Sequence, residues 1–446
     1  MGLALMERSF GLGGEGYSAI RRAERMKRPL AGRLMIAAAL ISLLSCPNTS
    51  EARPRPKPER APTAAAADIW VATWEASPEP QRPPLVKLAN ETVRMVAHVS
   101  LGGIFIRVRL SNEFGDKPLT IGAAHLGLSA GTGGGVQPGS DRTVTFGHQP
   151  TITIPPGARV LSDPVSLTVP SQADVVVSLY FPGDVGAVTE HYFGLQTSRL
   201  APGDNTAALE FPSAETITKQ VILTGLDVSA ASGTKTVVAL GDSLTGGFGS
   251  TMDANRRWPD DFSARVLGPK GLSKLSVVNA GISGNRLLHD FFGPNALSRF
   301  DRDVLSQPNV GYLVVELGIN DLGLPGGRNL PEEEVSADDM IAGFRQLIVR
   351  ANSYGIKVFF GTIPPFAGFT ERPGFYSDAA EIKREAINDW IRTNTEAQGY
   401  IDFEAALRDP DNPRRLNPRY DSGDHLDPND AGYQAMADAI EFRLFE

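Results

Sequence analysis

The chain has 446 residues, of which 41% are apolar and 21% are charged, and its formal net charge is −8 at pH 7. This length predicts more than one domain, and the composition excludes a chain that is disordered throughout. Nucleic-acid binding needs a basic face, so the negative net charge leads us to expect no nucleic-acid partner.

The first 52 residues have the pattern of a signal or targeting region. A basic flank at Met26-Lys27-Arg28 precedes an apolar run of about a dozen residues, which is too short to span a bilayer. We therefore expect a secreted or periplasmic protein with no transmembrane domain. The single cysteine, Cys46, follows Leu43-Leu44-Ser45, so a lipid anchor at Cys46 is the alternative to cleavage near Ala52. A lipoprotein would then result.

Residues 53–67 are rich in Pro and Ala and predict a linker. From residue 68 to 229, short runs of alternating apolar and polar residues are separated by turn signals such as Pro155-Pro156-Gly157. This pattern is typical of an all-β sandwich or jelly-roll domain. The expected strands include 104–110, 119–121, 144–146, 151–154 and 174–180.

Residues 234–446 alternate between strand-like and helical patterns. This alternation predicts an α/β domain, a three-layer α/β/α sandwich with a mostly parallel five-stranded sheet. Ligands of such folds bind at the carboxyl ends of the strands. The expected strands are 237–240, 275–279, 310–317, 356–362 and 400–403, and the expected helices include 336–352, 378–396 and 429–445.

The residues that follow these strands carry polar groups suited to acyl transfer. Ser243 supplies a hydroxyl, Asn320 supplies an amide donor, and Asp424 stands next to His425 before the last helix. A nucleophile, oxyanion donors and a carboxylate beside an imidazole are the parts that a serine ester mechanism requires. The blocks are Gly241-Asp242-Ser243-Leu244, Asn279-Ala280-Gly281-Ile282-Ser283-Gly284-Asn285-Arg286, Gly318-Ile319-Asn320-Asp321 and Asp424-His425-Leu426-Asp427-Pro428.

These four blocks, in this order, resemble the SGNH or GDSL hydrolase family over residues 234–446. The chain is also similar to a secreted bacterial subgroup of GDSL-type esterases in which a β domain precedes the hydrolase domain. The resemblance implies hydrolysis of carboxylic esters without a metal or other cofactor. It implies that Ser243 is the nucleophile, that the oxyanion hole is formed by Ser243, Gly284 and Asn320, and that Asp424 is the acid of the final block.

The final block departs from the family pattern, because Asp427 stands where the family has its catalytic histidine. A carboxylate with a pKa of about 4 is a weaker base than an imidazole with a pKa of about 6.5. Three alternatives follow. His425 replaces the missing base, Asp427 acts as a poor base, or the site is catalytically weakened in a carbohydrate-binding or envelope protein.

The sequence thus predicts a secreted serine esterase. Export and a preceding β domain favour an extracellular ester as substrate, such as acetyl or short acyl groups on an acylated polysaccharide.

Overall fold

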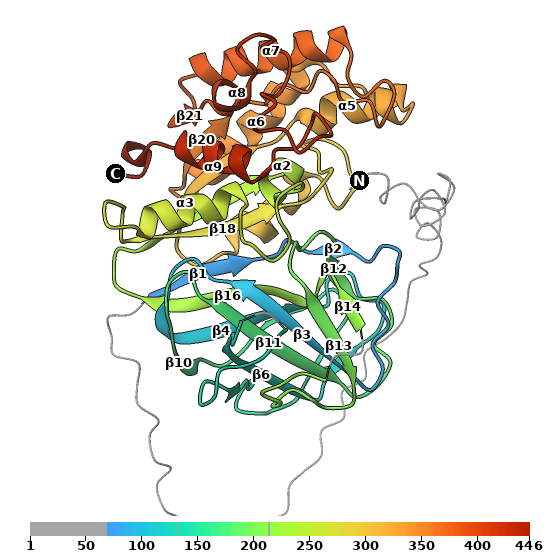
Figure 1. The fold of residues 1–446 in the computed structure, drawn as a ribbon, viewed down its shortest axis with the longest axis vertical. Coiled ribbons are helices and arrows are strands. Elements are labelled where there is room, and N and C mark those ends of the chain that lie inside the picture. The colour runs from blue at the N-terminus through green and yellow to red at the C-terminus, as the bar shows by residue number, and fades with distance from the viewer. Residues whose placement is uncertain (1–68, 132, 213–214) are drawn as a thin grey trace, which may run out of the picture.

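The computed structural model describes residues 69–131, 133–212 and 215–446. The signal region, the linker and Cys46 lie outside the described residues, so the interpretations placed on them stay predictions. Two bodies stack along the long axis of the molecule (Figure 1). We call residues 69–230 the β domain and residues 235–446 the α/β domain.

The β domain consists of antiparallel sheets, as predicted. Its two larger sheets enclose one apolar core, to which alternate residues such as Val93, Met95 and Ala97 contribute. One sheet has the order β1-β16-β4-β10, with β9 paired to β4: β1 (Ile69–Glu75), β16 (Leu223–Ala230), β4 (Gly103–Ser111), β10 (Val165–Val169) and β9 (Arg159–Leu161). The other has the order β14-β13-β3-β11-β6-β7: β14 (Glu215–Ile217), β13 (Ser198–Pro202), β3 (Glu91–His98), β11 (Asp174–Phe181), β6 (Ala123–Leu128) and β7 (Arg142–Thr143).

Two smaller sheets complete this domain. They are β15 (Gln220–Val221), β12 (Thr189–His191) and β2 (Glu79–Pro80), and the pair β5 (Leu119–Ile121) and β8 (Ile152–Ile154). The expected strand at 144–146 is wrong, because β7 ends at Thr143 and Phe146 forms only an isolated bridge. The carboxylate of Asp163 accepts hydrogen bonds from the Thr145 hydroxyl and from the His148 backbone, and so holds this segment as a turn.

The α/β domain contains the predicted parallel sheet of five strands, in the order β18-β17-β19-β20-β21. The strands are β17 (Lys235–Gly241), β18 (Leu275–Gly281), β19 (Val310–Glu316), β20 (Lys357–Gly361) and β21 (Gly399–Ile401). The first strand in the chain, β17, lies between β18 and β19, so the strand order reverses around its carboxyl end. Open α/β sheets bind ligands at such a point.

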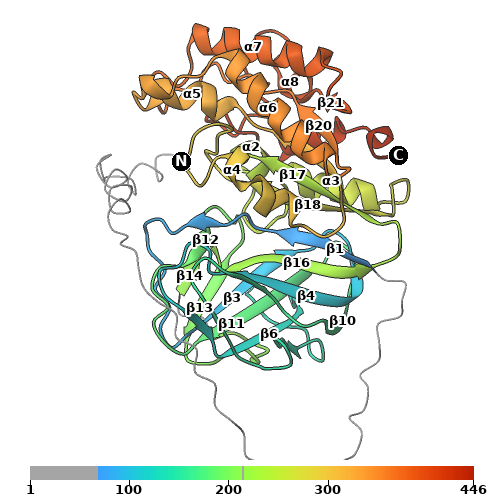
Figure 2. The same cartoon turned by 180° about the vertical axis from the view of Figure 1, so that it is seen from behind.

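Helices cover both faces of this sheet (Figure 2). Val237 and Ala239 face a core that includes Trp258 and Tyr433, whereas Val238 and Leu240 face the opposite core. The alternation follows from the two-residue period of a strand. The helices are α2 (Ser243–Gly246), α3 (Trp258–Leu267), α4 (Ala296–Phe300), α5 (Ile319–Gly327), α6 (Ala337–Asn352), α7 (Asp378–Thr393), α8 (Phe403–Leu407) and α9 (Asp430–Asp438), with a π-helical turn η2 (Asp301–Leu305) and the 3-10 turns η3 (Pro331–Glu333) and η4 (Phe442–Phe445).

The last helix is shorter than the predicted 429–445, because α9 ends at Asp438 and the chain then forms η4. The guanidinium group of Arg265 donates a hydrogen bond to the carbonyl of Ile440, 3.2 Å away. This carbonyl, which lies beyond the end of the helix, is therefore satisfied by a side chain. This bend brings Phe445 onto Phe262, with ring centroids 5.3 Å apart.

Edge strands of the two domains lie side by side where the bodies meet. β1 and β18 each form the edge of a sheet, and serine hydroxyls link them. Ser276 donates to the carbonyl of Ala72 at 2.6 Å and lies 2.8 Å from the hydroxyl of Ser100. Ser100 also accepts from the backbone N–H of Val277 at 3.1 Å. Each domain thus covers an edge that would otherwise be open to pairing with another chain.

No helix in the described ranges is both long and apolar enough to cross a membrane.

We expect Ser276→Ala to lower the free energy of unfolding by about 1–3 kcal/mol, because it leaves a buried carbonyl without its donor. Urea unfolding followed by circular dichroism measures the change. Ser353→Ala is the matched control, since that hydroxyl is exposed and bonds only within its own helix turn. Equal stability of the two variants would contradict a bonding role for Ser276.

Candidate active site

Ser243 stands at the carboxyl end of β17, on a tight turn. β17 ends at Gly241, and Asp242 caps α2 by accepting a hydrogen bond from the N–H of Leu244 at 3.1 Å. A Cβ at position 241 would lie 2.0 Å from the hydroxyl of Thr245, so the turn requires glycine there. The turn holds Ser243 just beyond the carboxyl end of β17, with 7% of the surface of the residue exposed.

The residues predicted to form the oxyanion hole meet at one cavity. Ser243, Gly284 and Asn320 all line it, although they follow three different strands. Gly284 has a φ of +77°, and a Cβ there would lie 2.1 Å from the ring of Phe292. The side-chain amide of Asn320 donates to Asp242 at 3.2 Å, which fixes its orientation. The structure brings these residues together, and their catalytic roles stay predictions.

Asp427 is the residue of the final block that reaches Ser243. It lines the same cavity as Ser243 with only 2% of its surface exposed, and the neighbouring Ser243 side chain favours its charged form. Asp424 accepts hydrogen bonds from the backbone N–H groups of Leu426 and Asp427, both at 2.8 Å. Its side chain acts on the carboxyl group of Asp427 in the opposite sense and raises its pKa. A serine and two carboxyl groups therefore form a continuous row.

His425 is not among the residues that line this cavity, and its role as the base, one of the three alternatives, stays a prediction. Its Nδ1 lies 2.5 Å from the carboxylate of Asp421, and its side chain is 53% exposed. Its backbone has a left-handed φ of +67°, and the ring packs beside Gly368. The left-handed turn and the pairing with Asp421 direct the imidazole away from the cavity, while Asp427, two residues on, points into it.

The loop after α2 holds the final block over the cavity. Thr251 donates from its backbone and from its hydroxyl to the carboxylate of Asp430, at 2.8 and 2.7 Å. A Cβ at Gly249 would lie 2.7 Å from the carbonyl of Pro428, so glycine lets the two segments touch. Asp427 precedes Pro428 and is placed by these contacts.

The cavity at Ser243 is small, about 30 Å³, and four phenylalanines are among the residues that line it. Its apolar wall is formed by Phe248, Phe292, Phe369, Phe375 and Leu426, and Arg372 also borders it. A site of this size has room for a short acyl group next to the serine.

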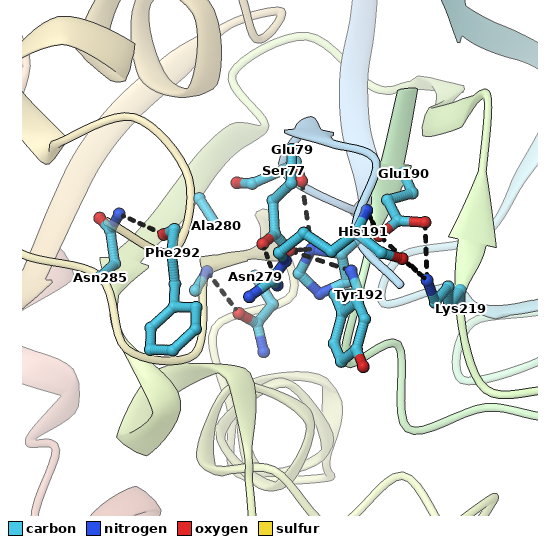
Figure 3. A network of polar contacts seen from close by, with 12 residues as sticks. Ser77, Glu79, Glu190, His191, Tyr192, Lys219, Asn279, Ala280, Asn285 and Phe292 are labelled. Atoms are coloured by element: carbon cyan, nitrogen blue, oxygen red, sulfur yellow. Dashed lines mark hydrogen bonds and ion pairs between the residues drawn. The ribbon is translucent and has the colours of Figure 1, made fainter. Parts of the chain in front are cut away.

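The β domain braces two of these phenylalanines. Phe193 packs edge-on against Phe248, with ring centroids 5.4 Å apart. The guanidinium carbon of Arg82 lies 5.1 Å from the ring centroid of Phe292, and Glu79 holds that arginine in an ion pair at 2.5 Å. Figure 3 shows polar contacts in this region, with Glu79 and Phe292 among the labelled residues. The wall of the cavity thus depends on both domains.

Residues 239–435 match the family model described as GDSL-like Lipase/Acylhydrolase. These residues form a GDSL-like lipase/acylhydrolase domain. Members of the family are generally esterases or lipases. No curated protein is significantly similar to the chain.

Three bacterial proteins are among the solved structures to which the chain is similar. A G-D-S-L family protein from Desulfitobacterium hafniense is 21% identical and has a TM-score of 0.35, covering 47% of this chain and 99% of its own. An acetyl xylan esterase from Geobacillus stearothermophilus is 20% identical with a TM-score of 0.36, covering 46% and 92%. A carbohydrate acetylesterase from Sinorhizobium meliloti is 16% identical with a TM-score of 0.36, covering 46% and 96%.

The GDSL-like domain buries several carboxyl groups around Ser243. Burial and the neighbouring charge of Asp424 raise the pKa of Asp427 well above its usual value. Burial also raises the pKa of Asp242 to about 7. Burial and the charge of Asp242 raise the pKa of Glu316 well above its usual value. In such a cluster the charged forms repel each other, so protons are retained at a pH where exposed carboxyls would be ionised.

Glu316 was missed by the sequence analysis. It is fully buried at the end of β19 and accepts a hydrogen bond from Thr245 at 3.3 Å. The sequence signal that could have identified it is a charged residue at the end of an otherwise apolar strand. Asp321 has a structural role, because its carboxylate accepts hydrogen bonds from the backbone N–H groups of Leu287 and Leu288, at 2.8 and 3.1 Å.

In the part of the chain that the structure describes, no group of three or more His, Cys, Asp or Glu side chains is arranged to hold a metal ion.

We expect Gly284→Ala to destabilise the GDSL-like domain by about 1–3 kcal/mol, through its positive φ and the clash with Phe292. Thermal unfolding measures this loss. Gly183→Ala is the control, because a Cβ at position 183 meets no atom within 4 Å. An unchanged melting temperature for Gly284→Ala would show that the turn has room for a side chain.

Proposed function

We propose that the protein is a carboxylic ester hydrolase in which Ser243 is the nucleophile and Asp427 is the base. The observation that carries this proposal is the placement of the Asp427 carboxyl beside Ser243, in a cavity that also contains Gly284 and Asn320. The raised pKa of Asp427 makes it a stronger base than an exposed aspartate, although fewer molecules are ionised at a given pH.

In the proposed reaction, the Ser243 oxygen attacks the ester carbonyl carbon while its proton passes to the carboxylate of Asp427. The negative oxygen that forms is stabilised by the N–H groups of Ser243 and Gly284 and by the amide of Asn320. When the carbon–oxygen bond to the alcohol breaks, the proton on Asp427 passes to the leaving oxygen. Water then attacks the acyl-enzyme and gives a proton to Asp427. When the carbon–oxygen bond to Ser243 breaks, this proton passes to the serine oxygen, so that the acid is released and both residues return to their starting forms.

We propose short acyl esters as substrates, with an acetyl group on an extracellular carbohydrate as the leading case. The aromatic cavity of about 30 Å³ next to Ser243 supports a small acyl group. The basic flank and apolar run within residues 1–52 support export to the periplasm or the exterior.

The second candidate is a protein of the same fold that binds its ligand with little hydrolysis. The same observation favours it, because the position of the usual catalytic imidazole is held by Asp427. An enzyme that loses the base of its triad typically keeps only about a 10³–10⁴-fold acceleration over the uncatalysed reaction in water.

We expect Asp427→His to raise kcat/KM for 4-nitrophenyl acetate by about 10²-fold or more, because an imidazole is a better base at neutral pH. Ser243→Ala should lose the activity of the unmodified protein, and His425→Ala should retain it, since His425 is paired with Asp421. Acetylated xylan provides a second substrate. If the unmodified protein is no faster than Ser243→Ala on both, the esterase proposal fails and the binding role is favoured. If His425→Ala abolishes activity, the base is His425.

We expect kcat/KM to fall as the pH drops through the raised pKa of Asp427, because only the ionised carboxylate accepts the proton of Ser243. The pH profile between pH 4 and 9 should therefore rise at a higher pH than the value of about 4 for an ordinary aspartate. Asp427→His should move this rise to about 6.5, the usual imidazole pKa. A profile that is already flat above pH 5 would be incompatible with Asp427 as the base.

A further inference from the structure

A second cavity, of about 390 Å³, lies between the β domain and the segment that contains η2. It shares no lining residue with the cavity at Ser243, which measures about 30 Å³. Its volume falls within the range of about 300–1,000 Å³ that is common for small-molecule sites. One wall is formed by β4 and β9, and the opposite wall by residues 302–308.

One side of this cavity is basic. Arg107 and Arg109 project from alternate positions of β4, and the Nε atoms of both donate to the buried carboxylate of Asp227, at 2.9 and 3.0 Å. Arg159 stands on β9, which pairs with β4, and lies on the same face. Arg109 and Arg159 both reach Ser306, at 3.2 and 3.4 Å, so they border the same part of the cavity.

The other side presents two buried side-chain oxygen atoms without a hydrogen-bond partner in the described chain. They are Oε2 of Glu75, whose residue is 5% exposed, and Oε1 of Gln307, whose residue is 8% exposed. A buried polar atom without a partner is costly, and a ligand that donates hydrogen bonds would remove this cost. Burial and the charge of Asp303 raise the pKa of Glu75 well above its usual value, which favours its neutral form, with one oxygen that donates and one that accepts. The four arginines of the lining, Arg107, Arg109, Arg159 and Arg302, then face three charged carboxylates, those of Asp227, Asp303 and Glu113.

We propose that this cavity binds an acidic saccharide, with its carboxylate on Arg109 and Arg159 and its hydroxyl groups on Glu75 and Gln307. The planar guanidinium group matches a carboxylate, with two parallel hydrogen bonds. These two groups suit a ligand with several hydroxyl groups, which both donate and accept, whereas an inorganic anion such as phosphate carries at most one or two O–H groups near neutral pH. Sugars that carry a carboxyl group, such as hexuronates, combine both features. This assignment does not depend on ester hydrolysis at Ser243.

Isothermal titration calorimetry with the full chain and trigalacturonate tests the site. Inorganic phosphate and the neutral maltotriose are the comparison ligands. We expect the unmodified protein to bind trigalacturonate at least about tenfold more tightly than either. Maltotriose lacks the carboxylate that forms charge-assisted hydrogen bonds with the arginines, and phosphate lacks the hydroxyl groups that would reach Glu75 and Gln307. Ser243→Ala should bind it equally well, which separates this site from the proposed esterase site. Equal affinity for phosphate would show a general anion site and overturn the proposal, as would the absence of trigalacturonate binding.

Two variants probe the two sides of the cavity. Arg159→Ala should weaken trigalacturonate binding about tenfold or more, and its side chain is 46% exposed, so its removal should leave the fold intact. Gln307→Leu should weaken binding by removing an acceptor while keeping the volume. Arg345→Ala is the matched control, because that side chain is 49% exposed in an ion pair on α6. Circular dichroism checks folding. If Arg159→Ala and Gln307→Leu, both folded, bind like the control, the proposal is wrong.

Discussion

The arrangement of both cavities depends on one buried cation, the guanidinium group of Arg299. It donates to the carbonyl of Gly241 at 2.9 Å and to that of Ala280 at 2.7 Å, which lie at the carboxyl ends of β17 and β18. The same group pairs with Asp303 at 2.8 Å and donates to the hydroxyl of Ser77 at 3.3 Å. A buried charge is tolerated only when its hydrogen bonds are satisfied, so these partners must all be in place together. Arg299 thereby fixes the strand ends relative to each other.

This constraint connects the two domains at the level of single atoms. Gly241 directly precedes the capping Asp242 and the nucleophile position, whereas Asp303 lines the larger cavity between the domains. Ser77 belongs to the β domain, next to the segment in which Glu79 holds Arg82 against the wall of the smaller cavity. The β domain is therefore part of the scaffold on which the GDSL-like domain places Ser243, besides contributing a cavity wall of its own.

The sequence was sufficient to predict which residues meet at the carboxyl ends of the strands. It was not sufficient to predict which side chains of the final block point toward the serine. Ser243, Gly284 and Asn320 could be expected together because parallel strands place their carboxyl ends at one edge. That Asp427 rather than His425 faces the serine depends on a left-handed residue and a pairing with Asp421, and neither has a local sequence signal strong enough to decide it. The larger cavity joins Glu75, Arg159 and Gln307, which are distant in the chain, so only the fold reveals it.

A carboxyl group in place of an imidazole need not end catalysis in such a site. A raised pKa makes the carboxylate a stronger base, although it also lowers the fraction of molecules in which the carboxylate is ionised. Raising the pKa of a base toward the working pH increases its strength while most of it stays ionised, whereas raising it further costs more in ionised fraction than it gains in strength. Burial sets the pKa of Asp427 in the first place, and Asp424 and Asp242 push it upward. The neighbouring Ser243 side chain lowers it. The balance among these buried groups, rather than the identity of residue 427 alone, decides how much base strength is available at the serine.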